Sequence, residues 1–334
     1  MSAADRPPTQ VDVAREAGVS RALVSIAYRG VKGITPETRQ RIFDVGDAMG
    51  YRPNVVAARL ASKYSSTIGV FLLDLYNEIF ADIYEGIRSV ITAESQHVVL
   101  TIGSSTGERD GEGLRNLQLA RADVVIAAGL MMPDDEIAAH NAITPIVSTA
   151  RQVPGVHSVY SDDLEGGRQA VAHLWGLGHR RIAHIASPRR QGYEGRRIGY
   201  ESAMAAHGLP PLVVEADYNQ RAAAAAAREL LDLADPPTAI FANNDVAALG
   251  VLDVLFERDL VPGRDLSVVG YDNTPVAQLP AISLTSIDLH AKALGVAAAN
   301  VALRRIESAD LPEQNQSSPP ELVVRRSTQP PRLR

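Results

Sequence analysis

Hydrophobic and polar residues follow a helical period over the first sixty residues of the chain. Val11, Ala14 and Ala17 fall on one face of a short segment that Thr9 can cap. Gly18 can end that segment, because glycine tolerates a left-handed backbone. We therefore predict a short helix that stops at a tight turn.

Two further helices are expected before residue 52. Ser20 can cap one over residues 21–29, and Thr35 can cap another that starts at Pro36 and ends at Gly50. The buried stripe of this third helix is predicted to comprise Ile42, Val45 and Met49. The segment VVAARLAS that follows is too short to be a stable helix in water without a partner.

From Thr67 onward the pattern changes to apolar runs of strand length, separated by helix-sized segments. The runs form two sets, namely TIGVFLLDL, HVVLTIGS, DVVIAAGL and PIVSTA, then RIAHIAS, LVVEAD, TAIFANN and LSVVGYD. Such runs are typical of strands buried on both faces, and hence of two lobes with parallel sheets. The consecutive alanines between Arg221 and Leu230 predict a helix, and ELVVRRST predicts one last strand.

Composition agrees with an ordinary globular protein, since 46% of residues are hydrophobic and 22% are charged. No apolar stretch reaches the roughly 18 residues that cross a bilayer, and the N-terminus lacks the apolar run of a signal peptide, so we expect a cytoplasmic protein. The absence of cysteine excludes disulfides, thiolate zinc sites and cysteine nucleophiles.

The net charge of -6 is unevenly distributed along the chain. Residues 1–64 carry +4 and the remaining residues carry -10, which suits a polyanion-binding part attached to an acidic body.

The first two predicted helices have the spacing of a helix-turn-helix, in which the second helix enters the major groove of DNA by its N-terminal residues. The side chains that would point at base edges are Arg21, Ala22, Ser25 and Ile26. Nearby basic residues would meet phosphates. An ordinary three-helix bundle with a polar surface is the alternative at this point.

The stretch TQVDVAREAGVSRALVSIAYRGVKGITPETRQRIFDVGDAMGYRPNVVAARLAS resembles the DNA-binding headpiece and hinge of the lactose-repressor/galactose-repressor (LacI-type) family of bacterial transcription regulators. Further segments resemble the sugar-binding-protein-like core of that family, in the family's order: SDDLEGGRQAVAHLWGLGHRRIAHI, RRIGYESAM, TAIFANNDVAALGVL, LSVVGYDN and LTSIDLHAKALG. The resemblance covers about 320 residues.

The resemblance implies an all-α helix-turn-helix headpiece and an α/β, periplasmic-binding-protein-like core of two doubly wound parallel-sheet lobes. We expect the headpiece at residues 1–52, a hinge helix and linker at 53–66, and the effector-binding and dimerisation core at 67–334. The N-lobe would take about 67–160 plus 288–320, and the C-lobe about 161–287 plus 321–328. In the hinge, Ala57 and Leu60 would face the minor groove, with Leu60 as an apolar wedge between base pairs.

The predicted reading helix departs from the family pattern. Where the family often has Thr-Val-Ser-Arg, this chain has Leu23-Val24-Ser25-Ile26, so an apolar side chain replaces an arginine that can grip guanine. Ile26 is then limited to apolar contact with a thymine methyl group. Arg21 and Arg29 become the candidates for hydrogen bonds to bases, with Leu23 beside them.

The resemblance also implies an effector site between the lobes, at the ends of the predicted strands. The residues expected to bind the effector are Asp74, Asn77, Phe80, Arg151, Asp162, Arg196, Tyr218, Asn244 and Asp272. Carboxylates, amides and rings in this combination favour a sugar or a related polyol. Ala150 stands where the family has an acid, and Arg151 beside it could instead hold a phosphate or carboxylate, which leaves the effector open.

Enzyme chemistry has little support in the sequence. Gly103-Ser104-Ser105-Thr106-Gly107 matches the G-x-S-x-G pattern of hydrolases, but a serine-rich loop matches it easily by chance. His173, His179 and His184 lack the spacing of metal ligands, so neither a metal nor a cofactor is expected.

The sequence therefore predicts a homodimeric, DNA-binding transcriptional regulator, a repressor, that binds a near-palindromic operator and responds to a small molecule. A solute-binding protein for transport or chemosensing, without DNA function, is the alternative. The missing signal peptide and the leading helix-turn-helix argue against that alternative.

Overall fold

The computed structural model describes residues 6–28, 33–52, 67–91, 96–188 and 193–332. The chain divides into two compact units, Met1–Ser65 and Ser66–Arg334. The predicted Arg29, Ala57 and Leu60 contacts lie outside the described residues.

The described part of the first unit is a small all-α fold. It contains α1 (Gln10–Glu16), α2 (Arg21–Tyr28) and α3 (Pro36–Ala48). Gly18 takes the predicted left-handed backbone with φ +63°, and the Ser20 hydroxyl accepts a hydrogen bond from the backbone N–H of Leu23 at 3.2 Å. Thr35 caps α3 in the same way. The buried residues at the centre of this fold are Val13, Ala14, Ala17, Val24, Ala27, Ile42 and Tyr51.

The second unit contains two six-stranded sheets, which confirms the predicted fold class. In the N-lobe the strand order is β11-β5-β4-β3-β1-β2, and the described strands all pair in parallel. These strands are β1 (Thr67–Leu72), β2 (His97–Ile102), β3 (Val124–Ala128), β4 (Ile146–Thr149), β5 (His157–Ser161) and β11 (Asn315–Ser318).

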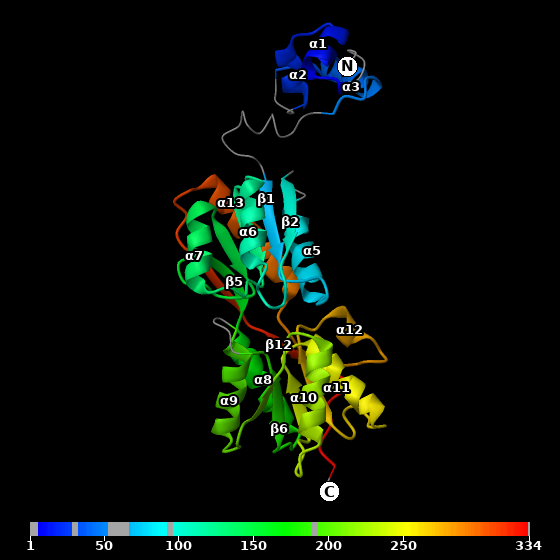
Figure 1. Cartoon of the computed structure of the whole chain (residues 1–334), viewed down its shortest axis with the longest axis vertical. Helices are drawn as coiled ribbons and strands as arrows, with labels where there is room; N and C mark the ends of the chain where they lie inside the picture. Colours follow the sequence, from blue (N-terminus) through cyan, green and yellow to red (C-terminus); the bar gives the residue numbers. More distant parts are fainter. Residues whose placement is uncertain (1–5, 29–32, 53–66, 92–95, 189–192, 333–334) are drawn as a thin grey trace. The chain divides into compact units, whose positions relative to one another are not determined.

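Helices cover both faces of the N-lobe sheet (Figure 1). They are α5 (Ile79–Ile91), α6 (Asp110–Leu119), α7 (Asp134–Ile143) and α13 (Ala291–Glu307). Helices α5 and α13 pack closely, because Gly86 and Gly295 each bring a bare backbone against the other helix. A Cβ at Gly86 would collide with the carbonyl oxygen of Lys292.

The C-lobe repeats the design with strand order β12-β10-β9-β8-β6-β7. Its strands are β6 (Ile182–Ala186), β7 (Leu212–Glu215), β8 (Ala239–Ala242), β9 (Ser267–Tyr271), β10 (Thr285–Asp288) and β12 (Glu321–Val323), of which β12 alone among the described strands pairs in antiparallel fashion. Its helices are α8 (Asp163–Gly176), α9 (Gly195–Ala206), α10 (Gln220–Leu231), α11 (Asp245–Glu257) and the short α12 (Pro275–Gln278).

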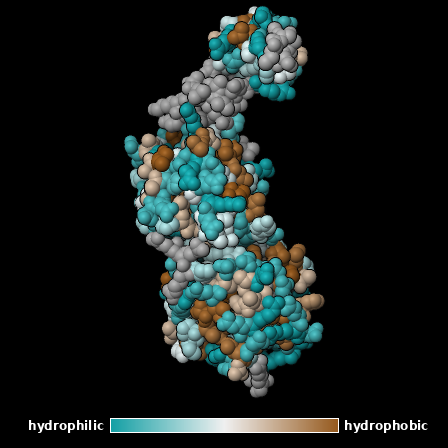
Figure 2. Space-filling model, in the orientation of Figure 1, coloured by the Kyte–Doolittle hydropathy of each residue, from teal (hydrophilic) through white to brown (hydrophobic). Residues whose placement is uncertain are grey.

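The apolar runs of the sequence form the interior of both lobes. β1, β3, β6, β8 and β9 are buried along their whole length. The face shown in Figure 2 is mostly hydrophilic, with separate hydrophobic patches. No helix among the described residues is long and apolar enough to cross a membrane.

Three strands were missing from the sequence prediction: β5, β10 and β11. β5 and β11 read HSVYS and NQSS, so neither carries the continuous apolar run that marked the other strands. β11 lies at the edge of its sheet, where polar residues are tolerated. All the strands that the apolar runs predicted are present.

Candidate functional site

The exposed face of α2 begins at its N-terminus. Arg21 and Ala22 are exposed, whereas Val24 and Ala27 are buried against the other helices of the first unit. Leu23, Ser25 and Ile26 are half-buried along the boundary between those faces. The helix therefore presents Arg21 and Ala22 most openly, as a helix that enters a groove by its N-terminus requires.

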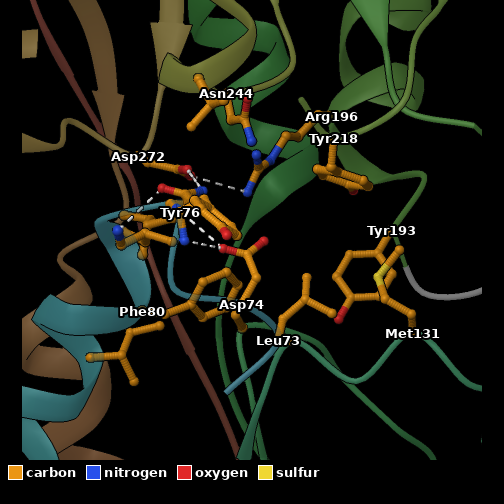
Figure 3. Close-up of a pocket in the computed structure, with 17 residues that line it drawn as sticks. Leu73, Asp74, Tyr76, Phe80, Met131, Tyr193, Arg196, Tyr218, Asn244 and Asp272 are labelled. Atoms are coloured by element: carbon orange, nitrogen blue, oxygen red, sulfur yellow. Dashed lines mark hydrogen bonds and ion pairs between the residues drawn. The ribbon is translucent and has the colours of Figure 1, made fainter. Parts of the chain in front are cut away.

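A cavity lies between the two lobes of the second unit, with an empty volume of about 680 Å³ that is partly open to solvent. Of the nine residues predicted to bind an effector, the structure brings seven to its lining: Asp74, Asn77, Phe80, Arg196, Tyr218, Asn244 and Asp272. They follow β1, β7, β8 and β9 or lie at the start of α5 and α9, that is, at the carboxyl ends of strands where α/β proteins bind ligands. Figure 3 shows several of these side chains pointing into one space.

Arg196 is the only charged cation among the lining residues, and it is tightly held. Its Nε lies 3.2 Å from a carboxylate oxygen of Asp163, and its Nη2 lies 3.6 Å from Asp272. Its Nη1 donates to the backbone oxygen of Asn243 at 2.6 Å, and its guanidinium stacks over the ring of Tyr271 at 3.7 Å. Burial opposes its charge, but the two carboxylates outweigh burial and raise the pKa of Arg196, so it stays charged.

Asp272 connects the two lobes. Its Oδ2 accepts a hydrogen bond at 2.9 Å from the side-chain amide of Asn77, which lies beyond β1 in the N-lobe. Burial raises the pKa of Asp272 to about 6, although Arg196 and the Asn77 amide favour its charged form. Its backbone is left-handed, with φ +98°, which is strained for a residue other than glycine. Strain of this kind is common at binding sites.

Asp74 and Asn77 shape the loop between β1 and α5. One carboxylate oxygen of Asp74 accepts hydrogen bonds from the backbone N–H groups of Tyr76 and Asn77, at 2.8 and 2.9 Å. The Glu78 carboxylate then accepts from the backbone N–H of Val276 in the C-lobe, at 3.1 Å. The loop is thus fixed at both ends, by its own carboxylate and by the opposite lobe.

Asn244 caps α11 and also faces the cavity. Its Oδ1 accepts from the backbone N–H of Ala247 at 2.8 Å, and Figure 3 shows its amide nitrogen on the cavity side. Behind it, Asp245 is fully buried and accepts hydrogen bonds from Thr274 and Ser286. Burial raises the pKa of Asp245 to about 7, with a further contribution from the negative charge of Asp272.

The structure places the other two predicted effector residues elsewhere. Arg151 does not line the cavity, because its Nη1 donates to the backbone oxygens of Leu130 and Met132 and its Nη2 pairs with Asp134. Its side chain is buried, so it holds the end of β3 to the start of α7. Asp162 is the N-cap of α8 and accepts from the backbone N–H of Glu165 at 3.0 Å.

Several lining residues were missed by sequence reasoning, among them Leu73, Tyr76, Met131 and Tyr193. Leu73 and Met131 follow the ends of β1 and β3, so the rule that ligands bind beyond strand ends could have found them. Tyr193 comes from the segment before α9 and donates its hydroxyl to the backbone oxygen of Leu130 at 2.8 Å. No periodic signal marks that segment.

Two of the three histidines noted in the sequence, and the serine-rich loop, make contacts within the fold. His173 and His179 are engaged with Thr328, Thr238 and Ser267, and the described residues contain no metal-binding group of three or more His, Cys, Asp or Glu. In the G-x-S-x-G segment, the hydroxyls of Ser104 and Thr106 contact each other at 3.2 Å.

Both units of the chain match known protein families. Residues 9–54 match the family model for bacterial regulatory proteins of the lacI family, and residues 171–328 match that for a periplasmic binding protein-like domain. Catabolite control protein A of Priestia megaterium is 31% identical over 84% of this chain and 86% of its own length. The HTH-type transcriptional repressor CytR of Escherichia coli (strain K12) is 29% identical over 96% of each chain.

Solved structures of related transcriptional regulators are also similar to this chain over nearly its whole length. The lac repressor dimer bound to operator and the anti-inducer ONPF has a TM-score of 0.86 at 28% identity, covering 97% of this chain and 100% of that one. The transcriptional regulator CelR in complex with cellobiose has a TM-score of 0.70 at 30% identity, covering 96% of this chain and 99% of that one. With a helix-turn-helix at one end and a two-lobed core at the other, this chain belongs to the lacI family of bacterial regulatory proteins, whose members are DNA-binding transcriptional regulators.

Proposed function

We propose that this chain is a cytoplasmic transcriptional repressor that binds a near-palindromic operator as a homodimer. A small molecule bound in the interlobe cavity would set its affinity for the operator. Residues 1–52 would read DNA, 53–66 would form the hinge, and 67–334 would bind the effector and dimerise. It has no enzymatic activity in this proposal. The observation that supports the proposal is that one chain contains both an exposed helix N-terminus, at Arg21 and Ala22, and a cavity at the strand ends of two lobes.

In the first unit, the DNA contacts would come from the start of α2. A dimer would present two copies of this helix to two half-sites, so one short helix per protomer can suffice. Arg21 would donate to base edges, while Leu23, Ser25 and Ile26 would line the contact and exclude water. The apolar Ile26 makes thymine methyl groups its expected partners.

In the second unit, the effector would act by changing the angle between the lobes. Hydrogen bonds already join them, from Asn77 to Asp272 and from Val276 to Glu78. A ligand that contacts Asp272, Arg196 and Asn244 would favour one closure angle over another. Because coupling is reciprocal, an effector that changes operator affinity must have its own affinity changed by the same factor, typically worth about 1–3 kcal/mol.

A direct test uses the intact protein and labelled DNA from the region upstream of its own gene. We expect a salt-sensitive complex in a gel-shift or anisotropy titration, and Arg21→Ala should weaken it by about 1–3 kcal/mol. Arg264→Ala is the matched control, because it removes the same charge from an exposed site beside Asp265 in the C-lobe. If the intact protein forms no complex with this DNA, the solute-binding alternative is favoured. If Arg21→Ala binds DNA as the parent protein does, the start of α2 is not the reading element.

A further inference from the structure

A second cavity lies in the N-lobe, at the opposite end of the sheet from the interlobe cavity. Because β4, β5 and β11 run in parallel, their starts lie side by side at that end, and α13 packs against β4 and β5. The cavity there has an empty volume of about 400 Å³ and is partly open to solvent. We call it the N-lobe end cavity, and its lining includes Asn141, Pro145, His157, Arg305, Leu311 and Glu313.

Arg305 brings an unpaired cation to the N-lobe end cavity. It lies in the last turn of α13 and is half-buried. Within the part of the chain that the structure describes, its guanidinium has neither a hydrogen bond nor an ion pair. Arg151 and Arg196, by contrast, are each paired with a carboxylate. The planar guanidinium matches a carboxylate through two parallel hydrogen bonds, so Arg305 offers a position for a ligand carboxylate.

The same cavity has two neutral hydrogen-bond donors. His157 is 8% exposed, and its Nδ1 accepts a hydrogen bond from the backbone N–H of Gln314 at 3.0 Å. Burial lowers the pKa of His157, and the positive charge of Arg305 lowers it further, so the ring is neutral at pH 7 with its proton on Nε2. Asn141 uses its Oδ1 to accept from the backbone N–H of Ile146 at 2.8 Å. Among the described residues, no acceptor takes the side-chain N–H groups of Asn141.

Glu313 adds a carboxylate to the lining of this cavity. Its Oε1 accepts from the side-chain amide of Asn315 at 2.7 Å, and its Oε2 has no partner among the described residues. A doubly charged anion such as a phosphate ester would be repelled by this carboxylate, whereas an ammonium group would pair with it. Leu311 and Pro145 contribute a small apolar surface, which fits a short aliphatic group.

We propose that the N-lobe end cavity binds a free amino acid with an aliphatic side chain, at a ligand site separate from the interlobe cavity. The carboxylate of the amino acid pairs with Arg305 and accepts a hydrogen bond from Nε2 of His157. Its ammonium group pairs with Glu313, and its side chain contacts Leu311. The two cavities share no lining residue, so this site does not depend on the function proposed above.

The test screens the standard L-amino acids on the full-length protein by thermal shift, followed by isothermal titration calorimetry. At least one aliphatic amino acid should raise the melting temperature, because a ligand of the native state stabilises it. That amino acid is then compared with its amide, which lacks the carboxylate, and with its N-acetyl derivative, which lacks the ammonium group. Each analogue should bind about tenfold or more weakly, because it leaves Arg305 or Glu313 without a partner. Inorganic phosphate should give no shift.

Two variants locate the bound amino acid. Arg305→Gln removes the cation and Glu313→Gln removes the anion, so each should weaken binding by about tenfold or more. Arg221→Gln is the matched control, because it removes the same charge from the exposed first turn of α10 in the C-lobe and should leave binding unchanged. The proposal is overturned if no amino acid binds, or if inorganic phosphate or either analogue binds as tightly as the amino acid itself. It is also overturned if either cavity variant binds the amino acid as the parent protein does, since the ligand would then lie elsewhere.

Discussion

Removing the charge of Arg196 should destabilise the second unit strongly at neutral pH. Arg196→Met keeps the length of the apolar stem but leaves two carboxylates, Asp163 and Asp272, without their cation. Both carboxylates are largely buried, with side-chain exposures of 20% and 4%. Breaking a buried pair by removing one partner costs about 3–5 kcal/mol, because an uncompensated charge stays in a poorly solvated place.

The expected size can be converted into a melting temperature. A unit of this size loses about 2 °C per kcal/mol, so the loss should be about 6–10 °C at pH 7.5. At pH 5.5 the loss should be smaller. The pKa of Asp272 is already about 6 beside Arg196, and without the guanidinium it must rise, so that the carboxyl is neutral at the lower pH.

The assay is differential scanning calorimetry of the parent, Arg196→Met, Asp272→Asn and the double variant. Since Asp272→Asn removes one of the stranded charges, the double variant should be more stable than the two separate losses predict, by about 1 kcal/mol or more. Additive losses, or a single-variant loss below about 1 kcal/mol, would refute the idea that charge pairing holds Arg196 in place.

Three other perturbations follow from single contacts. Burial lowers the pKa of His184 from 6.5 to about 4. As the pH drops below 6.5, the unfolded chain therefore takes up a proton on this residue before the folded chain does, and the free energy of unfolding falls by about 2 kcal/mol by pH 5. Urea titrations of His184→Phe should show a flatter dependence of that free energy on pH. An unaltered profile would exclude His184 as the cause. Gly86→Ala should lower stability by about 1–3 kcal/mol, because its methyl group meets the Lys292 carbonyl and forces α5 from α13; an unchanged melting temperature would contradict this. Asn77→Ala should cost about 1–3 kcal/mol by leaving Asp272 without its amide donor, and equal unfolding free energies for variant and parent would count against that contact.

The sequence predicted the strands correctly wherever burial on both faces produced a continuous run of apolar residues. The runs TIGVFL and VVIAA became β1 and β3, fully buried on both faces. β11 was not readable, because NQSS is a strand only by virtue of pairing with β5, more than 150 residues earlier in the chain. Pairing of that kind depends on tertiary structure rather than on local propensity.

The sequence predicted part of the cavity lining, because several of its residues directly follow predicted strands. Asp74 and Asp272 follow strand ends, where parallel sheets gather polar side chains, and the structure brings them to one cavity. Arg151 also follows a strand, but the competing partner, Asp134, comes from the start of another helix and takes its guanidinium away from the cavity. Tyr193 reaches the lining from a segment with no period at all. Such residues are found only when both lobes are in place.

The operator affinity of the intact protein, measured with and without its effector, tests whether ligand binding in the interlobe cavity controls DNA binding. The sugar or sugar derivative that gives the largest shift in a thermal-shift screen would be added at saturation to an anisotropy titration with upstream DNA. We expect the operator dissociation constant to change by about fivefold or more, and saturating operator to change the ligand's dissociation constant by the same factor. Operator binding that is identical with the cavity empty and filled would contradict it.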